Sequence, residues 1–122
     1  MTFTDRSSAG SAVAYKAPVR VASTANLTLS GTQTIDGVAV VAGDRVLAKD
    51  QTTGADKGIY VVASGAWERA PDWDGTGDVV TGTLVFVTAG TTNAKRVYYV
   101  STTGTITIGT TSVSFTLGTT LS

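Results

Sequence analysis

The chain has 122 residues, which is enough for one domain with a genuine hydrophobic core but not for two. Nine basic and nine acidic residues give a formal net charge of zero, and they are scattered too thinly to form a stripe that would bind nucleic acid. Histidine and cysteine are absent, which removes the commonest general base, the usual zinc ligands and any disulfide framework.

Threonine, glycine, valine and alanine dominate the composition, and strong helix formers are scarce, which favours strands and turns over helices. The longest apolar runs, such as residues 38–42 and 59–63, are too short to span a bilayer. The first residues lack the charged-then-apolar pattern of a signal peptide. We therefore expect a soluble protein, made in the cytoplasm, with neither a membrane nor a nucleic acid as partner.

Residues 1–18 are predicted to form an extended N-terminal arm, because they are polar or small and show no strand period. Such a segment buries too little apolar surface to order itself, so the arm is expected to be flexible unless a neighbouring molecule fixes it. Residues 19–122 are expected to form a single domain.

From Val19 onwards, short strands alternate with turn signals. The stretch 34–51 is the clearest part: Asp36-Gly37 and Gly43-Asp44 predict two tight turns between three strands, with valines 38, 40 and 41 suited to a buried surface. The whole set of predicted strands is 19–22, 27–29, 32–35, 38–41, 45–48, 59–63, 66–69, 83–88, 96–100, 105–108 and 112–117. These strands predict an all-β fold, a small antiparallel β-sandwich or barrel.

Residues 83–88 are apolar on both faces of their strand, so we expect that strand to lie in the interior.

Acidic residues offer one candidate metal site. Asp72, Asp74 and Asp78 alternate with glycines and resemble half of a calcium-binding loop. The glutamate that closes an EF-hand loop is missing and no helices flank the segment, so we favour an ordinary turn and expect no metal or other cofactor.

Two pairs of acidic residues, Glu68 with Asp72 and Asp44 with Asp50, are the candidates for a glycosidase acid and base. Neither pair belongs to a recognisable motif, and no nucleophile elbow or phosphate-binding loop occurs. We therefore expect a protein that is not an enzyme. In the favoured interpretation these charges lie on a polar strand edge, where Arg45 pairs with an acidic neighbour.

Aromatic residues are the candidates for binding another molecule, since their flat faces can stack on a sugar or anchor an interface. Tyr60 and Trp67 are expected in the core, and one of the adjacent residues Tyr98 and Tyr99 must face inward. Trp73 lies in a predicted loop and is expected to be exposed. The predicted interface residues are Arg6, Tyr15, Lys16 and Trp73.

The segment Val19–Gly31, followed by residues 33–38 and 42–47, resembles a module that recurs in virion proteins of tailed bacteriophages, many of them tail-fibre proteins. The similarity continues through the segments 49–52, 57–62 and 66–70, and more loosely through 85–93 and 109–115. The resemblance implies a structural module, and no catalytic residue is associated with it.

One module with an arm suits a capsid decoration or cement protein on the virion surface, anchored to the major capsid protein through the arm. Phage proteins of this kind lead us to expect a homotrimer, and small sheets have edges that self-assembly can cover. Two alternatives stay open. One is a small tail-fibre or receptor-binding component that contacts host surface carbohydrate, and the other is a free carbohydrate-binding module.

Overall fold

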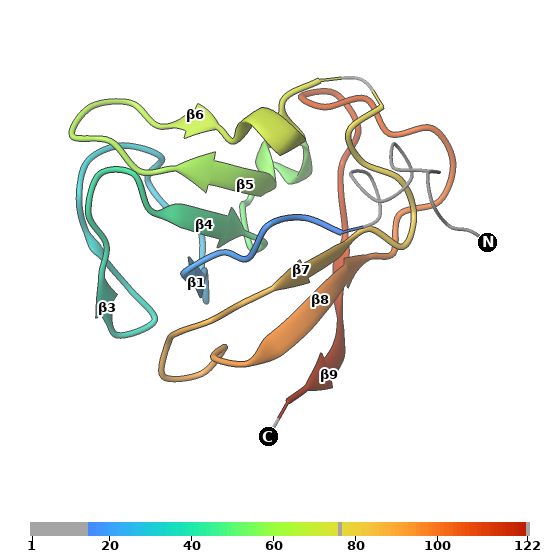
Figure 1. Cartoon of the computed structure of the whole chain (residues 1–122). Helices are drawn as coiled ribbons and strands as arrows, with labels where there is room; N and C mark the ends of the chain where they lie inside the picture. The colour runs from blue at the N-terminus through green and yellow to red at the C-terminus, as the bar shows by residue number, and fades with distance from the viewer. Residues whose placement is uncertain (1–14, 76, 122) are drawn as a thin grey trace.

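The computed structural model describes residues 15–75 and 77–121. These residues form three β-sheets and two single-turn 3-10 helices, which confirms the predicted all-β class (Figure 1). One sheet has the strand order β1-β4-β5-β6, a second has the order β7-β8-β9, and β2 pairs only with β3. The sheets do not close into a barrel, so the arrangement is the sandwich-like one of the two that were predicted.

The strands are short. They are β1 (Val21–Ala22), β2 (Thr34–Ile35), β3 (Val38–Ala39), β4 (Arg45–Ala48), β5 (Gly58–Val61), β6 (Glu68–Arg69), β7 (Leu84–Phe86), β8 (Arg96–Val100) and β9 (Phe115–Thr120). The 3-10 helices are η1 (Gly54–Asp56) and η2 (Pro71–Trp73). The predicted bounds of β4 and β8 are confirmed, whereas β9 begins and ends later than predicted.

Two predicted strands do not form, because other hydrogen bonds take the place of strand pairing in both cases. At residues 27–29, the side chain of Gln51 accepts a hydrogen bond from the Leu27 N–H and donates one to its carbonyl, in the place of a neighbouring strand. At residues 105–108, the Thr107 carbonyl accepts hydrogen bonds from Thr110 and Thr111, and this closes a turn. Alternating sequence alone does not distinguish such segments from strands.

The stretch 34–51 contains the three predicted strands, but they do not lie in one sheet. Asp36 and Gly37 adopt φ angles of 47° and 81°, so the predicted tight turn joins β2 to β3. The next strand, β4, instead pairs in parallel with β1 and antiparallel with β5. The parallel pair departs from the purely antiparallel fold that was predicted, because a contact between distant segments leaves no local signal.

The turn before β4 exposes one of the predicted core valines. Val40 is buried, but Val41 is 55% exposed. Asp44 fixes this turn by accepting hydrogen bonds from the Val41 N–H and from Arg20, each through Oδ2. Partial burial raises the pKa of the Asp44 carboxyl, but these two hydrogen bonds outweigh it and hold the pKa below its ordinary value.

The segment from Tyr15 to Ser23 joins the two larger sheets. Tyr15 and Val19 form parallel bridges alongside β7, and the N–H groups of Arg20 and Ser23 then donate to carbonyls of β4. Figure 1 shows this segment, in blue, passing between β7 and β4. Residues 15–18, the end of the predicted arm, therefore hydrogen-bond to the domain, whereas residues 1–14 lie outside the described residues.

The core consists of two clusters, one between the two larger sheets and one between the four-stranded sheet and the β2–β3 hairpin. As predicted, Tyr60 and Trp67 are buried, and Tyr98 faces inward while Tyr99 is partly exposed. In the described residues no helix is long and apolar enough to cross a membrane.

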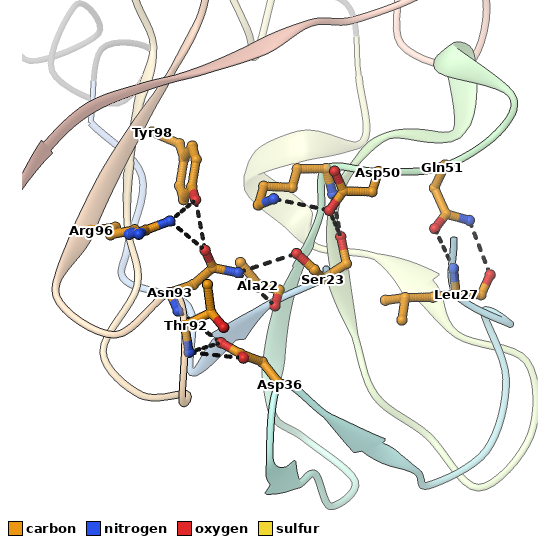
Figure 2. A network of polar contacts seen from close by, with 11 residues as sticks. Ala22, Ser23, Leu27, Asp36, Asp50, Gln51, Thr92, Asn93, Arg96 and Tyr98 are labelled. Carbon is orange, nitrogen blue, oxygen red and sulfur yellow. Dashed lines mark hydrogen bonds and ion pairs between the residues drawn. The ribbon is translucent and has the colours of Figure 1, made fainter. Parts of the chain in front are cut away.

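A buried polar network holds the three sheets together, with Asn93 at its centre (Figure 2). The Asn93 side chain is 1% exposed, and its Nδ2 donates to the carbonyls of Ala22 and Ser23 at 3.3 and 3.2 Å. Its Oδ1 accepts from the Tyr98 hydroxyl at 2.7 Å. The backbone N–H of Asn93 donates to Asp36, in the β2–β3 turn, at 2.8 Å. One residue therefore connects β1, the loop before β8 and the β2–β3 hairpin.

Replacing Asn93 with alanine is expected to lower the free energy of unfolding by about 2–3 kcal/mol, because buried polar groups lose their partners. Urea unfolding monitored by circular dichroism measures the change. Thr92→Ala is the matched control, since Thr92 is exposed and binds Asp36 through its backbone N–H. A loss at Thr92 equal to that at Asn93 would contradict the assignment.

Asp44→Asn is expected to reduce the acid sensitivity of the fold. Because the folded-state pKa of Asp44 is lowered, its stabilisation is present above the unfolded-state pKa and is lost as the pH falls through the folded value. The variant is therefore less stable than the parent at neutral pH, and the difference narrows as the pH is lowered from neutral through the folded-state pKa. Melting temperatures across this range provide the measurement. A difference that does not change with pH would show that the charge of Asp44 is not responsible.

Candidate functional site

The outer face of the β7-β8-β9 sheet is apolar. In the register of β7 and β8, Leu84 lies opposite Tyr99 and Phe86 lies opposite Val97, so these four side chains share one face. All four are partly exposed, whereas Val85 and Tyr98, on the other face, are buried in the core. We call Leu84, Phe86, Val97 and Tyr99 the outer face.

A hollow of about 420 Å³ lies on this outer face. It is lined by Leu84, Phe86 and Val97 of the face, by Gly118 and Thr119 of β9, and by Tyr15 and Lys16. Tyr15 is 68% exposed at its rim, whereas Lys16 is buried and its Nζ donates to the Asp78 carbonyl at 2.5 Å. Burial lowers the pKa of Lys16, although the carboxyl groups of Asp72 and Asp78 oppose this shift.

Arg45 fixes the chain segment at the rim of the hollow. Its Nη1 and Nη2 donate to the two carboxylate oxygens of Asp72 at 3.0 Å each, which is the bidentate geometry of a strong pair. Its Nη2 and Nε also donate to the carbonyls of Ala17 and Pro18 at 2.9 and 3.2 Å. Arg45 thus pairs with an acidic residue, as predicted, but the partner is Asp72 of η2 and not an acidic residue of its own strand edge. The contacts of Arg45 hold Tyr15 in position through the adjoining backbone.

The prediction that Trp73 is exposed is wrong. Trp73 is completely buried, and its ring stacks on Phe115 with centroids 5.6 Å apart. The 3-10 helix η2, which Pro71 begins, turns the indole inward. Gly58 leaves room for it, since a Cβ there would lie 2.5 Å from the indole Nε1. Trp73 therefore stabilises the core and is not accessible as an interface anchor.

The acidic residues of the candidate calcium loop contact the protein itself. Asp78 Oδ2 accepts hydrogen bonds from the backbone N–H groups of Asp74 and Gly75, which is a turn, and Asp72 pairs with Arg45. Among the residues that the structure describes, no three His, Cys, Asp or Glu side chains gather in a way that could hold a metal ion.

Three of the four acidic residues of the candidate glycosidase pairs form ion pairs with basic side chains, and the fourth is exposed. Asp44 pairs with Arg20, and Asp50 pairs with Lys49 and accepts a hydrogen bond from Ser23. Asp72 binds Arg45, and Glu68 is exposed on β6. The charges of the stretch 44–50 thus act mainly in contacts that hold the fold.

Of the predicted interface residues, the structure brings together Tyr15 and Lys16, which both line the hollow. Arg6 lies outside the described residues, and Trp73 is in the core. Sequence reasoning missed Leu84, Phe86 and Val97. The signal was present, because residues 83–88 are apolar on both faces, but it was interpreted as an interior strand, whereas one of the two faces is partly exposed.

No family model matches this chain, and neither a curated protein nor a solved structure shows significant similarity to it.

The burial of Trp73 can be tested by fluorescence in a Trp67→Phe variant, which leaves Trp73 as the sole tryptophan. We expect blue-shifted emission and weak quenching by iodide in the native state, and a red shift with strong quenching in urea. The reciprocal Trp73→Phe variant, which reports on Trp67, is the control. Native emission from Trp73 that is as accessible to iodide as in urea would contradict the buried position.

Proposed function

We propose that this protein is a non-catalytic structural component of a tailed-phage virion, namely a capsid decoration protein on the virion surface. In this proposal, the outer face and the residues that precede Tyr15 bind the major capsid protein of the shell. The observation that carries it is the apolar hollow on the outer face, with the N-terminal part of the chain entering the domain at its rim. The resemblance to phage virion modules supports the same assignment.

The chemistry of the hollow favours an apolar, uncharged partner surface. Among the described residues no carboxylate lines it, and the ammonium group of Lys16 is bound to the Asp78 carbonyl. Exposed apolar patches of this kind mark interaction sites in soluble proteins. Residues 1–14 adjoin Tyr15, and an extended segment of that length spans at most about 50 Å. A shell subunit that binds this segment would therefore lie within reach of the outer face.

The engagement of the acidic residues supports a structural role. A general acid or base must reach its substrate within hydrogen-bond distance. Asp44, Asp50 and Asp72 instead pair with arginine or lysine, and Asp78 accepts backbone hydrogen bonds in its own loop.

A second candidate function is a small tail-fibre or receptor-binding component that contacts host surface carbohydrate. The exposed ring of Tyr15 beside the hollow favours it, because an aromatic face next to an apolar depression suits the stacking of a sugar. Both functions use the same surface, so they differ in the partner and not in the residues. The homotrimer that we expect of phage proteins of this kind stays a prediction.

Tyr15→Ala is expected to weaken binding to expanded empty capsids of the encoding phage by about tenfold or more, the effect of losing an interface hot spot. Cosedimentation of the labelled protein with capsids measures the affinity. Val41→Ala is the matched control, because Val41 is also exposed but lies in the turn before β4. A truncated chain that lacks residues 1–14 but keeps residues 15–18 should bind capsids more weakly and have an unchanged melting temperature.

Two results would contradict the capsid assignment. One is full binding by the Tyr15→Ala variant and by the truncated chain. The other is binding to host cells that free surface polysaccharide blocks, with no binding to capsids, which would assign the protein to the tail.

A further inference from the structure

Strand β9 is an edge that lacks the usual protection against pairing. It is the longest of the described strands, and it ends the β7-β8-β9 order in the described part of the chain. Residues 116–120 are exposed, including Leu117 at 43%. Arg96 is the last charged side chain in the sequence, so β9 itself carries no charged side chain. Edge strands are commonly blunted by lysine, proline or extreme shortness. Here the protection is limited to a bulge, where Gly118 lies between the paired residues Leu117 and Thr119.

The register shows which backbone groups of β9 face the open edge. Val100 exchanges hydrogen bonds with Thr83 and Gly82, on the β7 side of β8, whereas the Ser101 N–H donates towards the β9 side. In an antiparallel ladder successive residues direct their N–H and C=O groups to opposite sides. Phe115 lies opposite Val100, and Leu117 lies opposite Tyr98. Phe115 and Leu117 therefore direct their backbone groups away from β8, towards the open edge.

We propose that this edge pairs with β9 of a second copy of the chain, antiparallel and across a two-fold axis. Other edges are poor partners for it. Strand β6 consists of the charged residues Glu68 and Arg69, and β1, β2 and β3 have two residues each. The edge of β7 is occupied by the segment from Tyr15 to Val19. Strand β9 is both long and uncharged, so the edge that fits it best is that of β9 in a second copy of the chain.

The two-fold axis passes between the Thr116 residues of the two copies. This register places Phe115 of one copy opposite Leu117 of the second copy, so that the outward backbone groups of both residues form hydrogen bonds in the new ladder. The bulge at Gly118 limits regular pairing beyond this point. Leu117, which is 43% exposed in one copy, would be covered by the neighbouring strand. A pairing of identical edges closes at two copies, so this contact gives a dimer in place of the homotrimer that the resemblance alone leads us to expect.

The absence of native cysteine permits a direct test by disulfide trapping. Beside the proposed axis, Thr116 lies opposite Thr116 of the second copy. The two residues form a non-hydrogen-bonded pair with Cα atoms about 4.5 Å apart, which is within disulfide range. Thr116→Cys should form a covalent dimer under mild oxidation at micromolar concentration. Thr34→Cys is the matched control, since Thr34 is an exposed strand threonine on β2, and this variant should form little covalent dimer.

Equilibrium sedimentation of the unmodified chain should give twice its mass of 12.4 kDa. Leu117→Lys should shift the equilibrium to the monomer, because it places a charge from each chain at the paired edge. Leu117→Pro should do the same by removing an N–H that faces the open edge. The control Val41→Lys should leave the dimer intact. Circular dichroism identifies any variant that fails to fold.

A monomer at all accessible concentrations, a mass of three chains, or equal trapping at positions 34 and 116 would overturn the proposal. The pairing does not depend on the proposed function, because sedimentation and trapping involve no capsid. Loss of capsid binding on Tyr15→Ala would leave this prediction unchanged.

Discussion

The fold depends on the side chain of Asn93, which satisfies buried backbone carbonyls where the sheets meet. Short strands provide few ladder hydrogen bonds, so the contacts between sheets must supply part of the specificity. The carboxamide of Asn93 fits this position because it donates hydrogen bonds to the carbonyls of Ala22 and Ser23 and accepts one from the Tyr98 hydroxyl. A buried polar group of this kind is costly if it is unpaired, and the network therefore selects one relative placement of the sheets.

Arg45 performs a similar task at the other end of the connecting segment. Its guanidinium group makes four hydrogen bonds, two to Asp72 and two to backbone carbonyls, in a planar geometry that the single ammonium group of a lysine cannot reproduce. This arrangement links the start of the described chain to the loop that buries Trp73. The position of Tyr15 at the rim of the hollow is therefore set by the bridge to Leu84 of β7 and by the contacts of Arg45 with the adjoining backbone and with Asp72.

The sequence reveals the local parts of this structure and misses the contacts between distant segments. The turn at Asp36-Gly37 and the strands β4 and β8 follow from patterns within a few residues. The parallel pairing of β1 with β4 and the capping of Leu27 by Gln51 have no such pattern. For the candidate site, Tyr15 and Lys16 were predicted. The burial of Trp73 was not predicted, because Gly58, which leaves room for its indole, lies on β5 and not in the same loop.

The outer face and the edge of β9 belong to one sheet but present different groups. Side chains stand perpendicular to a sheet, whereas backbone N–H and C=O groups lie in its plane. Contacts on the outer face and pairing along β9 are therefore compatible. An antiparallel pair has its two-fold axis perpendicular to the sheet, so both copies would present their hollows on the same side. Two linked hollows can bind two sites of a repeating surface, and the second attachment then occurs at a high effective concentration. Pairing through β9 would thus strengthen attachment to a shell without any additional contact on the outer face.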